Sequence, residues 1–257
     1  MRKATFFYLL RRGLLTGAGG FIRDGLVMAS KFITQGLTHP AQGSAEFDGS
    51  SDYIDTNAQL ISTNHTIQAW VYRDSSGTND VNYVLAMRDA ANDGLLVFSR
   101  SNTSISIKFD AQTEIQYTSF TSDEWHHIAS TYDGTTEKFY FNGSVVGTGT
   151  FSDTLSVTAD TIIGRDSGSG TSNFWDGNLA NVAIWNRALS SDEINSVMWK
   201  GYQSLTSTEK SGLKAWYSLD DVASPSASLA TMEALAVDKN ATIENKAAIT
   251  AAINALS

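Results

Sequence analysis

Two adjacent histidines, His126 and His127, have the residue type and the spacing from which a metal clamp or a general base could be built. They lie in the segment 125–132, where β-branched and aromatic residues predict a strand. Adjacent strand residues point to opposite faces of a sheet, so the two imidazoles cannot bind one ion together. Nothing nearby supplies the remaining ligands of a metal site. We therefore expect both histidines to pack and hydrogen-bond within the fold.

Three aspartates, Asp48, Asp52 and Asp55, surround a Gly-Ser turn. Calcium takes six to eight oxygen ligands, and loop carboxylates of this kind could supply some of them. These residues are therefore candidate calcium ligands, although the sequence requires no cofactor. The alternative is that Asp48 and Asp52 cap turns by accepting hydrogen bonds from backbone N–H groups.

Three aromatic side chains, Trp175, Tyr53 and Tyr117, are candidates for stacking on sugar rings. Trp175 follows a segment rich in Gly and Ser, which favours an exposed loop. The alternative for Trp175 is that its ring closes one end of the fold, because tryptophan side chains are mostly buried.

The first 43 residues differ in charge from the rest of the 257-residue chain. They sum to +5, and the chain sums to -9, which leaves -14 for residues 44–257. The acidic total argues against nucleic-acid binding by the whole chain. We expect residues 1–43 to be a basic arm that anchors the protein to a partner. The candidate anchoring residues are Arg11, Arg12, Phe21 and Arg23.

The apolar stretches of this arm are short or interrupted by charges. None reaches the roughly 20 apolar residues that a membrane-spanning helix needs, so we expect no membrane span. A cleaved signal peptide and an amphipathic membrane-surface anchor are the alternatives. The chain has no cysteine, which excludes a disulfide framework and a thiolate metal site.

From Ser44 onward, short runs of β-branched and aromatic residues recur between Gly, Asn, Asp and Ser, and thirteen of them are candidate strands. So many strands pack most simply as an all-β, antiparallel two-sheet sandwich. Asn142-Gly143 predicts a tight hairpin turn, because both residues tolerate positive φ. Ser190 and Glu193 form the pattern of a capping box and predict the start of a helix. Residues 222–257 are rich in Ala and predict a tail of short amphipathic helices.

Seven segments in this order resemble the concanavalin A-like, laminin-G-like jelly-roll family, of the kind found in tailed-phage structural proteins. They are residues 45–55, 66–71, 125–143, 162–165, 174–179, 184–190 and 212–220. The resemblance implies a jelly-roll domain over residues 44–221. It implies function only by class: binding of glycans or proteins, hydrolysis of glycans, or a structural role.

Two functional motifs of the family's members are missing from this sequence. Hydrolytic relatives carry Glu-x-Asp-x-x-Glu, whereas the acidic clusters Asp123-Glu124 and Asp192-Glu193 are adjacent pairs that would diverge on a strand. Glycoside hydrolysis needs two facing carboxyl groups, so we expect no enzyme. Many relatives carry Gly-x-Ile-Asp-Asp near the last sheet strand. Here residues 177–181 are Gly-Asn-Leu-Ala-Asn, which lack both acids and count against a calcium site of the family type.

The function that the sequence favours is that of a virion structural or accessory protein: a capsid decoration protein, head fibre or tail component made in the host cytoplasm. The arm would bind other virion proteins, and the jelly roll would form a homo-oligomer and display a surface for host glycans. The alternative is a secreted, extracellular bacterial lectin or adhesin that binds carbohydrate.

Overall fold

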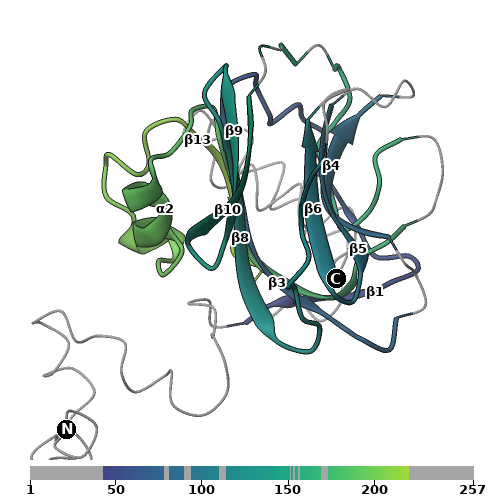
Figure 1. Cartoon of the computed structure of the whole chain (residues 1–257). Helices are drawn as coiled ribbons and strands as arrows, with labels where there is room; N and C mark the ends of the chain where they lie inside the picture. The colour runs from purple at the N-terminus through teal and green to yellow at the C-terminus, as the bar shows by residue number, and fades with distance from the viewer. Residues whose placement is uncertain are drawn as a thin grey trace, which may run out of the picture. The chain divides into compact units, whose positions relative to one another are not determined.

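The computed structural model of the chain describes residues 43–77, 81–89, 94–109, 114–150, 152, 154–155, 157–168 and 173–219. Two antiparallel β-sheets lie face to face, and the helix α2 (Ser191–Val197) lies on the outer side of one of them (Figure 1). The expected all-β jelly-roll sandwich is confirmed. Residues 1–42 and 220–257, which include nearly all of the predicted arm and the whole predicted tail, lie outside the described residues.

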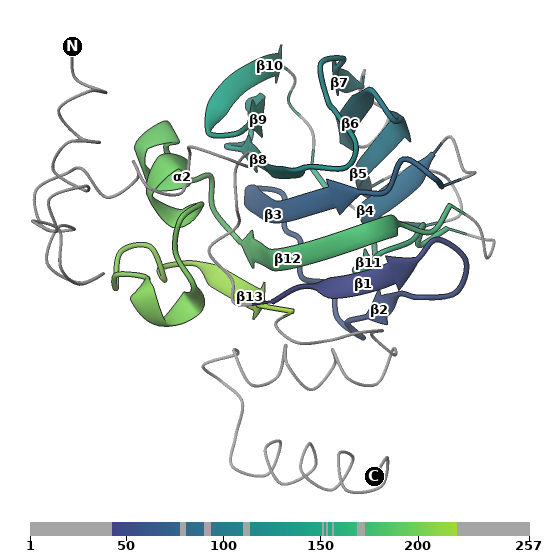
Figure 2. The ribbon, with the colours of Figure 1, turned by 90° about the horizontal axis from the view of Figure 1, so that it is seen from below.

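One sheet has seven strands in the order β1-β12-β3-β8-β9-β10, and β13 also pairs with β12. Figure 2 shows β1 and β13 along the same side of β12. The strands are β1 (Ala45–Asp48), β3 (His65–Arg73), β8 (Trp125–Tyr132), β9 (Thr136–Phe141), β10 (Ser144–Thr150), β12 (Asp176–Trp185) and β13 (Leu213–Tyr217). Asn142 and Gly143 join β9 to β10 with φ of 49° and 80°. The two positive values are those that the Asn-Gly turn predicts.

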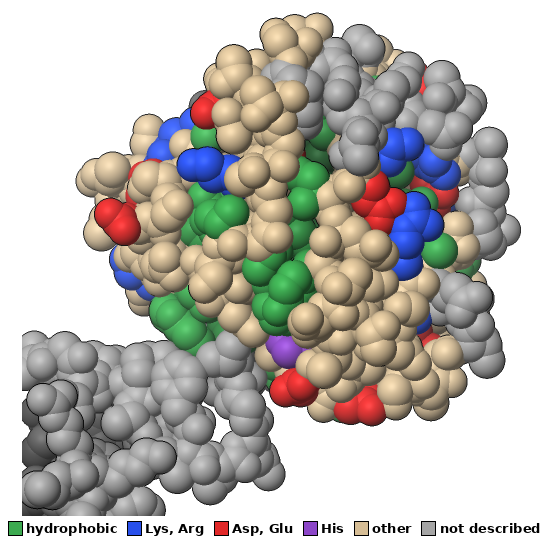
Figure 3. Space-filling view, viewed as in Figure 1, with side chains coloured by type: hydrophobic (Ala, Val, Ile, Leu, Met, Phe, Trp, Pro, Cys, Tyr) green, Lys and Arg blue, Asp and Glu red, His purple; other side chains and the backbone are tan. Residues whose placement is uncertain are grey.

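The other sheet has six strands in the order β2-β11-β4-β5-β6-β7. The strands are β2 (Ile54–Asp55), β4 (Asn82–Arg88), β5 (Gly94–Ser101), β6 (Ser104–Phe109), β7 (Ile115–Tyr117) and β11 (Ile162–Ile163). The edge strand β7 lies near β10, the edge strand of the seven-stranded sheet. Ile115 and Val146 pack against the core from these two edges. Figure 3 shows hydrophobic side chains along this boundary between the sheets.

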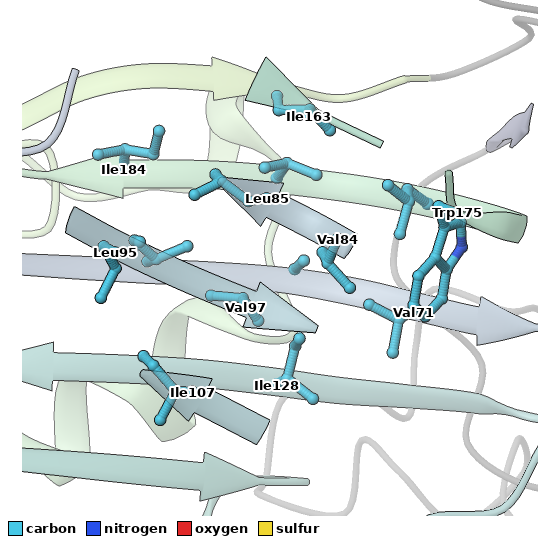
Figure 4. Close-up of a cluster of buried hydrophobic side chains, with 14 of the residues drawn as sticks. Val71, Val84, Leu85, Leu95, Val97, Ile107, Ile128, Ile163, Trp175 and Ile184 are labelled. Atoms are coloured by element: carbon cyan, nitrogen blue, oxygen red, sulfur yellow. The ribbon is translucent and has the colours of Figure 1, made fainter. Parts of the chain in front are cut away.

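The main core fills the space between the two sheets. Strand alternation directs Val71 of β3, Val97 of β5 and Ile128 of β8 into it, and Figure 4 shows these side chains meeting there. Apolar burial of this kind stabilises a fold by roughly 25 cal/mol for each Å² removed from water, so this core is the main source of stability.

A second apolar cluster lies on the outer face of the seven-stranded sheet, beneath α2. Ile194 and Val197 of α2 pack against Trp185 and Trp216 of the sheet. The helix begins at the predicted capping box: the Ser190 hydroxyl accepts a bond from the Glu193 N–H at 3.2 Å, and the Glu193 carboxylate accepts one from the Ser190 N–H at 2.9 Å. The helix therefore covers the part of this outer face that Trp185 and Trp216 form.

Candidate functional site

Trp175, a sequence-predicted sugar-stacking residue, lies in the core between the sheets with 0% of its surface exposed. Figure 4 draws its ring in the same cluster as Val71 and Val84. A ring without exposed surface offers no face to a sugar. The prediction that Trp175 binds glycan is therefore wrong, and the structure agrees with the alternative that this ring packs inside the sandwich.

Tyr53 and Tyr117 are half-buried and lie at opposite edges of the six-stranded sheet, Tyr53 just before its first strand. Tyr53 precedes β2 and Tyr117 ends β7, and these strands are the opposite edges of the sheet. The Arg165 guanidinium carbon lies 4.0 Å from the Tyr53 ring centroid. The Tyr117 ring packs on Phe141 with centroids 4.5 Å apart. The structure does not bring the three sequence-predicted aromatic residues into one site.

The Asp48 carboxylate is engaged in its own turn. It accepts hydrogen bonds from the backbone N–H groups of Ser50, Ser51 and Asp52 at 2.7–3.0 Å. Burial acts to raise the pKa of Asp48, but these bonds and those from serine hydroxyls outweigh it and hold the pKa below its ordinary range. Asp55 caps the N–H of Asn57 in the same way. The geometry favours turn capping, and no group of three potential metal-ligating side chains is found among the described residues.

His126 and His127 lie on opposite faces of β8, as the strand alternation predicts. The His126 ring packs on Phe120 and Phe141 on the inner side. The His127 ring meets Trp70 edge-on on the outer side, with centroids 5.5 Å apart. Burial lowers the pKa of His127 to about 3, so this imidazole is neutral at physiological pH. The structural role expected for both histidines is confirmed.

A serine, a histidine and a glutamate meet in the core, in a combination that sequence inspection does not single out. The Ser130 hydroxyl donates to one oxygen of Glu137, and the His65 Nε2 atom lies 3.9 Å from the other oxygen. The hydroxyl is thus bonded to the carboxyl group rather than to the imidazole, unlike the nucleophile of a catalytic triad. All three side chains are buried, so the cluster has no access to a substrate.

A line of side chains crosses four neighbouring strands on the outer face of the seven-stranded sheet. We name it the outer row. Cross-strand pairing aligns its members on four neighbouring strands: Glu46 of β1, Asn178 of β12, Tyr72 of β3 and Trp125 of β8. Their chain neighbours Phe47, Leu179 and Val71 point into the core, so alternation directs the outer row away from it.

Two aromatic rings form one end of the outer row. The rings of Tyr72 and Trp125 lie with centroids 5.8 Å apart and planes tilted by 55°, and both side chains are half-buried. Trp199, also half-buried, lies further along this face and packs on Trp70 at 5.3 Å. The Trp70 indole N–H donates to the Met198 carbonyl at 2.8 Å, which ties this face to the end of α2.

Polar groups form the other end of the outer row. Glu46 is exposed, and the Asn178 amide, which is half-buried, donates to the Ser44 hydroxyl at 3.2 Å. A carboxylate accepts hydrogen bonds, and a primary amide both donates and accepts them. Aromatic faces beside such groups suit a ligand that has an apolar face and a rim of hydroxyls.

Residues 48–195, more than half of the chain, match the family described as Laminin_G_3, concanavalin A-like lectin/glucanases superfamily. The chain belongs to this family. The family resemblance expected from the sequence is thereby confirmed, and it covers the outer row except for Glu46. A search of curated proteins found no match.

Solved structures similar to this family member include a putative carbohydrate-binding protein from Bacteroides ovatus, with a TM-score of 0.56 and 16% identity. The match covers 72% of this chain and 53% of that protein, so this chain spans about half of its length. The CBM40 module of Ruminococcus gnavus IT-sialidase, solved with α2,3-sialyllactose, matches with a TM-score of 0.51 and 13% identity over 61% of this chain and 96% of the module.

A leech intramolecular trans-sialidase matches with a TM-score of 0.50 and 12% identity, over 65% of this chain and 29% of that enzyme. At these identities the likeness to all three structures shows the fold, a lectin-like jelly roll. In the described part of the chain, no helix is long and apolar enough to cross a membrane. The predicted anchoring residues Arg11, Arg12, Phe21 and Arg23 lie outside the described residues.

Proposed function

We propose that this protein is a lectin-like module that binds glycans through the outer row. The observation that carries the proposal is the alignment of two half-exposed aromatic rings with an amide and a carboxylate across four neighbouring strands. The carbohydrate-binding modules among the structural neighbours support it at the level of the fold.

The chemistry of the outer row matches a pyranose. The faces of Tyr72 and Trp125 take the apolar C–H face of the sugar, because aromatic rings bury large apolar areas at little entropic cost. The Asn178 amide and the Glu46 carboxylate bond to hydroxyls at the sugar rim. The row lies on paired strands, so its geometry is set before the ligand arrives and little ordering cost opposes binding.

The proposal predicts that Tyr72→Ala and Trp125→Ala each weaken glycan binding tenfold or more, or about 1.4 kcal/mol, since buried aromatic anchors dominate such contacts. A glycan array identifies a ligand for the wild-type protein, and isothermal titration calorimetry then measures each variant. Circular dichroism checks that the variants fold.

Tyr117→Ala and Tyr53→Ala are the matched controls, because they remove half-buried tyrosines from the other sheet and its rim. Both are expected to leave the affinity unchanged. If Tyr53→Ala or Tyr117→Ala abolishes binding while Tyr72→Ala and Trp125→Ala do not, the binding site lies at the position expected from the sequence and not at the outer row.

The comparisons support the lectin interpretation better than the virion interpretation, because the similar structures include carbohydrate-binding modules. Assembly into a virion through the basic arm stays a prediction. Mass spectrometry of purified particles from a producing host would check it.

A further inference from the structure

Five carboxylates gather at the end of the seven-stranded sheet that bears the outer row. Glu46 belongs to the row itself. Asp48 and Asp176 are cross-strand partners two residues further along β1 and β12. Asp74 follows β3 and donates its N–H to the Asp176 carbonyl at 3.0 Å, and Asp123 precedes β8. The surface next to the proposed sugar contacts is therefore dense in negative charge.

Little positive charge offsets these five carboxylates. None of them takes part in the ion pairs within 4.0 Å among the described residues. Arg73, the basic residue next to Tyr72 on β3, is buried, and its charge acts on Asp176. Burial raises the pKa of Asp176, and the charges of Asp74 and Asp48 add to this effect against that of Arg73. The negative field of these five carboxylates therefore acts on any ligand group that binds at the outer row.

We propose that the outer row binds neutral and amino-bearing glycans and rejects acidic ones, including sialylated glycans. The inference rests on the proposed function and adds the class of ligand. At physiological ionic strength the screening length is about 8 Å, so carboxylates beside the contact surface act on a bound sugar. Like charges placed at a binding surface select against a partner, whereas an ammonium group is attracted.

The test compares pairs of glycans that differ in charge. Lactose and 3′-sialyllactose differ by an acidic sugar, and N,N′-diacetylchitobiose and chitobiose differ by ammonium groups. We expect 3′-sialyllactose to bind at least tenfold more weakly than lactose, and chitobiose to bind more tightly than its acetylated form. Both differences should shrink at 0.5 M NaCl.

Two substitutions locate the effect. Glu46→Gln and Asp74→Asn each remove one charge, and Asn at position 74 keeps the side-chain oxygen that accepts the Ser76 N–H. Each should narrow the difference between lactose and 3′-sialyllactose severalfold. Asp160→Asn makes the same charge change at an exposed position beside the other sheet and should leave the difference unaltered.

Sialyllactose binding as tight as lactose binding, or tighter, would overturn the charge selection while leaving glycan binding in place. If both Glu46→Gln and Asp74→Asn discriminate against 3′-sialyllactose as strongly as the wild type does, these carboxylates are not the source of the selection, and the proposal is overturned. If no glycan of either pair or of an array binds, the proposed function fails, and the inference fails with it.

Discussion

Among the described residues, the buried Glu137 has a strongly raised pKa. Burial raises its pKa to about 8, whereas burial lowers the pKa of His65 beside it to about 4. At pH 7 the carboxyl group is therefore protonated and the imidazole is neutral, so the core contains an uncharged pair. A buried charge without a close partner would cost several kcal/mol, which explains why both groups take their neutral forms.

The raised pKa of Glu137 predicts how stability depends on pH. The native carboxyl keeps its proton up to about pH 8, whereas the unfolded one loses it near 4.5. Its contribution is complete below pH 4.5 and is lost as the pH rises through 8. The buried His65 acts in the opposite sense between about 4 and 6.5. The free energy of unfolding should therefore fall between pH 6.5 and 8, by up to about 1.4 kcal/mol per pH unit.

Glu137→Gln isolates this effect, because an amide accepts the bond from the Ser130 hydroxyl but does not titrate. Urea denaturation at a series of pH values should show the variant gaining stability relative to the wild type as the pH rises to 8. An identical pH dependence in the two proteins would mean that Glu137 is already ionised at pH 7 in the folded state.

Among the elements, the helix α2 is stabilised by the capping box at its first residues. Ser190→Ala removes the hydroxyl that accepts the Glu193 N–H and should cost about 1 kcal/mol of unfolding free energy, measured by urea denaturation. Ser211→Ala, at an exposed position outside α2, serves as the control. Equal stability of the two variants would show that packing on Trp185 and Trp216, and not the cap, stabilises the helix.

The strand β10 forms an open edge of the seven-stranded sheet and has no charged residue. Its Val145 is 45% exposed. Uncharged edge strands pair with other chains, and a lysine on such an edge discourages pairing. Val145→Lys should lower light scattering of concentrated protein while leaving the thermal midpoint nearly unchanged. Scattering equal to that of the wild type would show that aggregation starts elsewhere.

The elements themselves could be predicted well from local patterns. The strand at 125–132, the Asn142-Gly143 turn and the cap at Ser190 depend on neighbouring residues, and the structure places all three as expected. The candidate site could not be predicted, because Tyr72 and Asn178 meet only through the pairing of strands distant in sequence. The position of Trp175 could not be predicted for another reason: a tryptophan beside a loop is equally compatible with an exposed ring that contacts a ligand and with a ring buried at the end of the core.

For the whole molecule, the net negative and the net positive charge of the sequence lie in different parts of the chain. Part of the acidic share lies at one end of the jelly roll, where it adjoins the outer row, whereas the basic residues of positions 1–42 lie outside the described residues. The family fold accounts for the sandwich, and the outer row is the surface through which we propose that it binds glycans.

The outer row draws its four residues from positions 46, 72, 125 and 178, so no fragment shorter than residues 46–178 contains it. A sugar that binds there binds the native state and not the unfolded one. Thermodynamic linkage then requires that a glycan at 100 times its Kd raise the free energy of unfolding by about 2.7 kcal/mol. A rise in thermal midpoint with added sugar would thus report binding and complete sheet assembly in one measurement, without any label on the ligand.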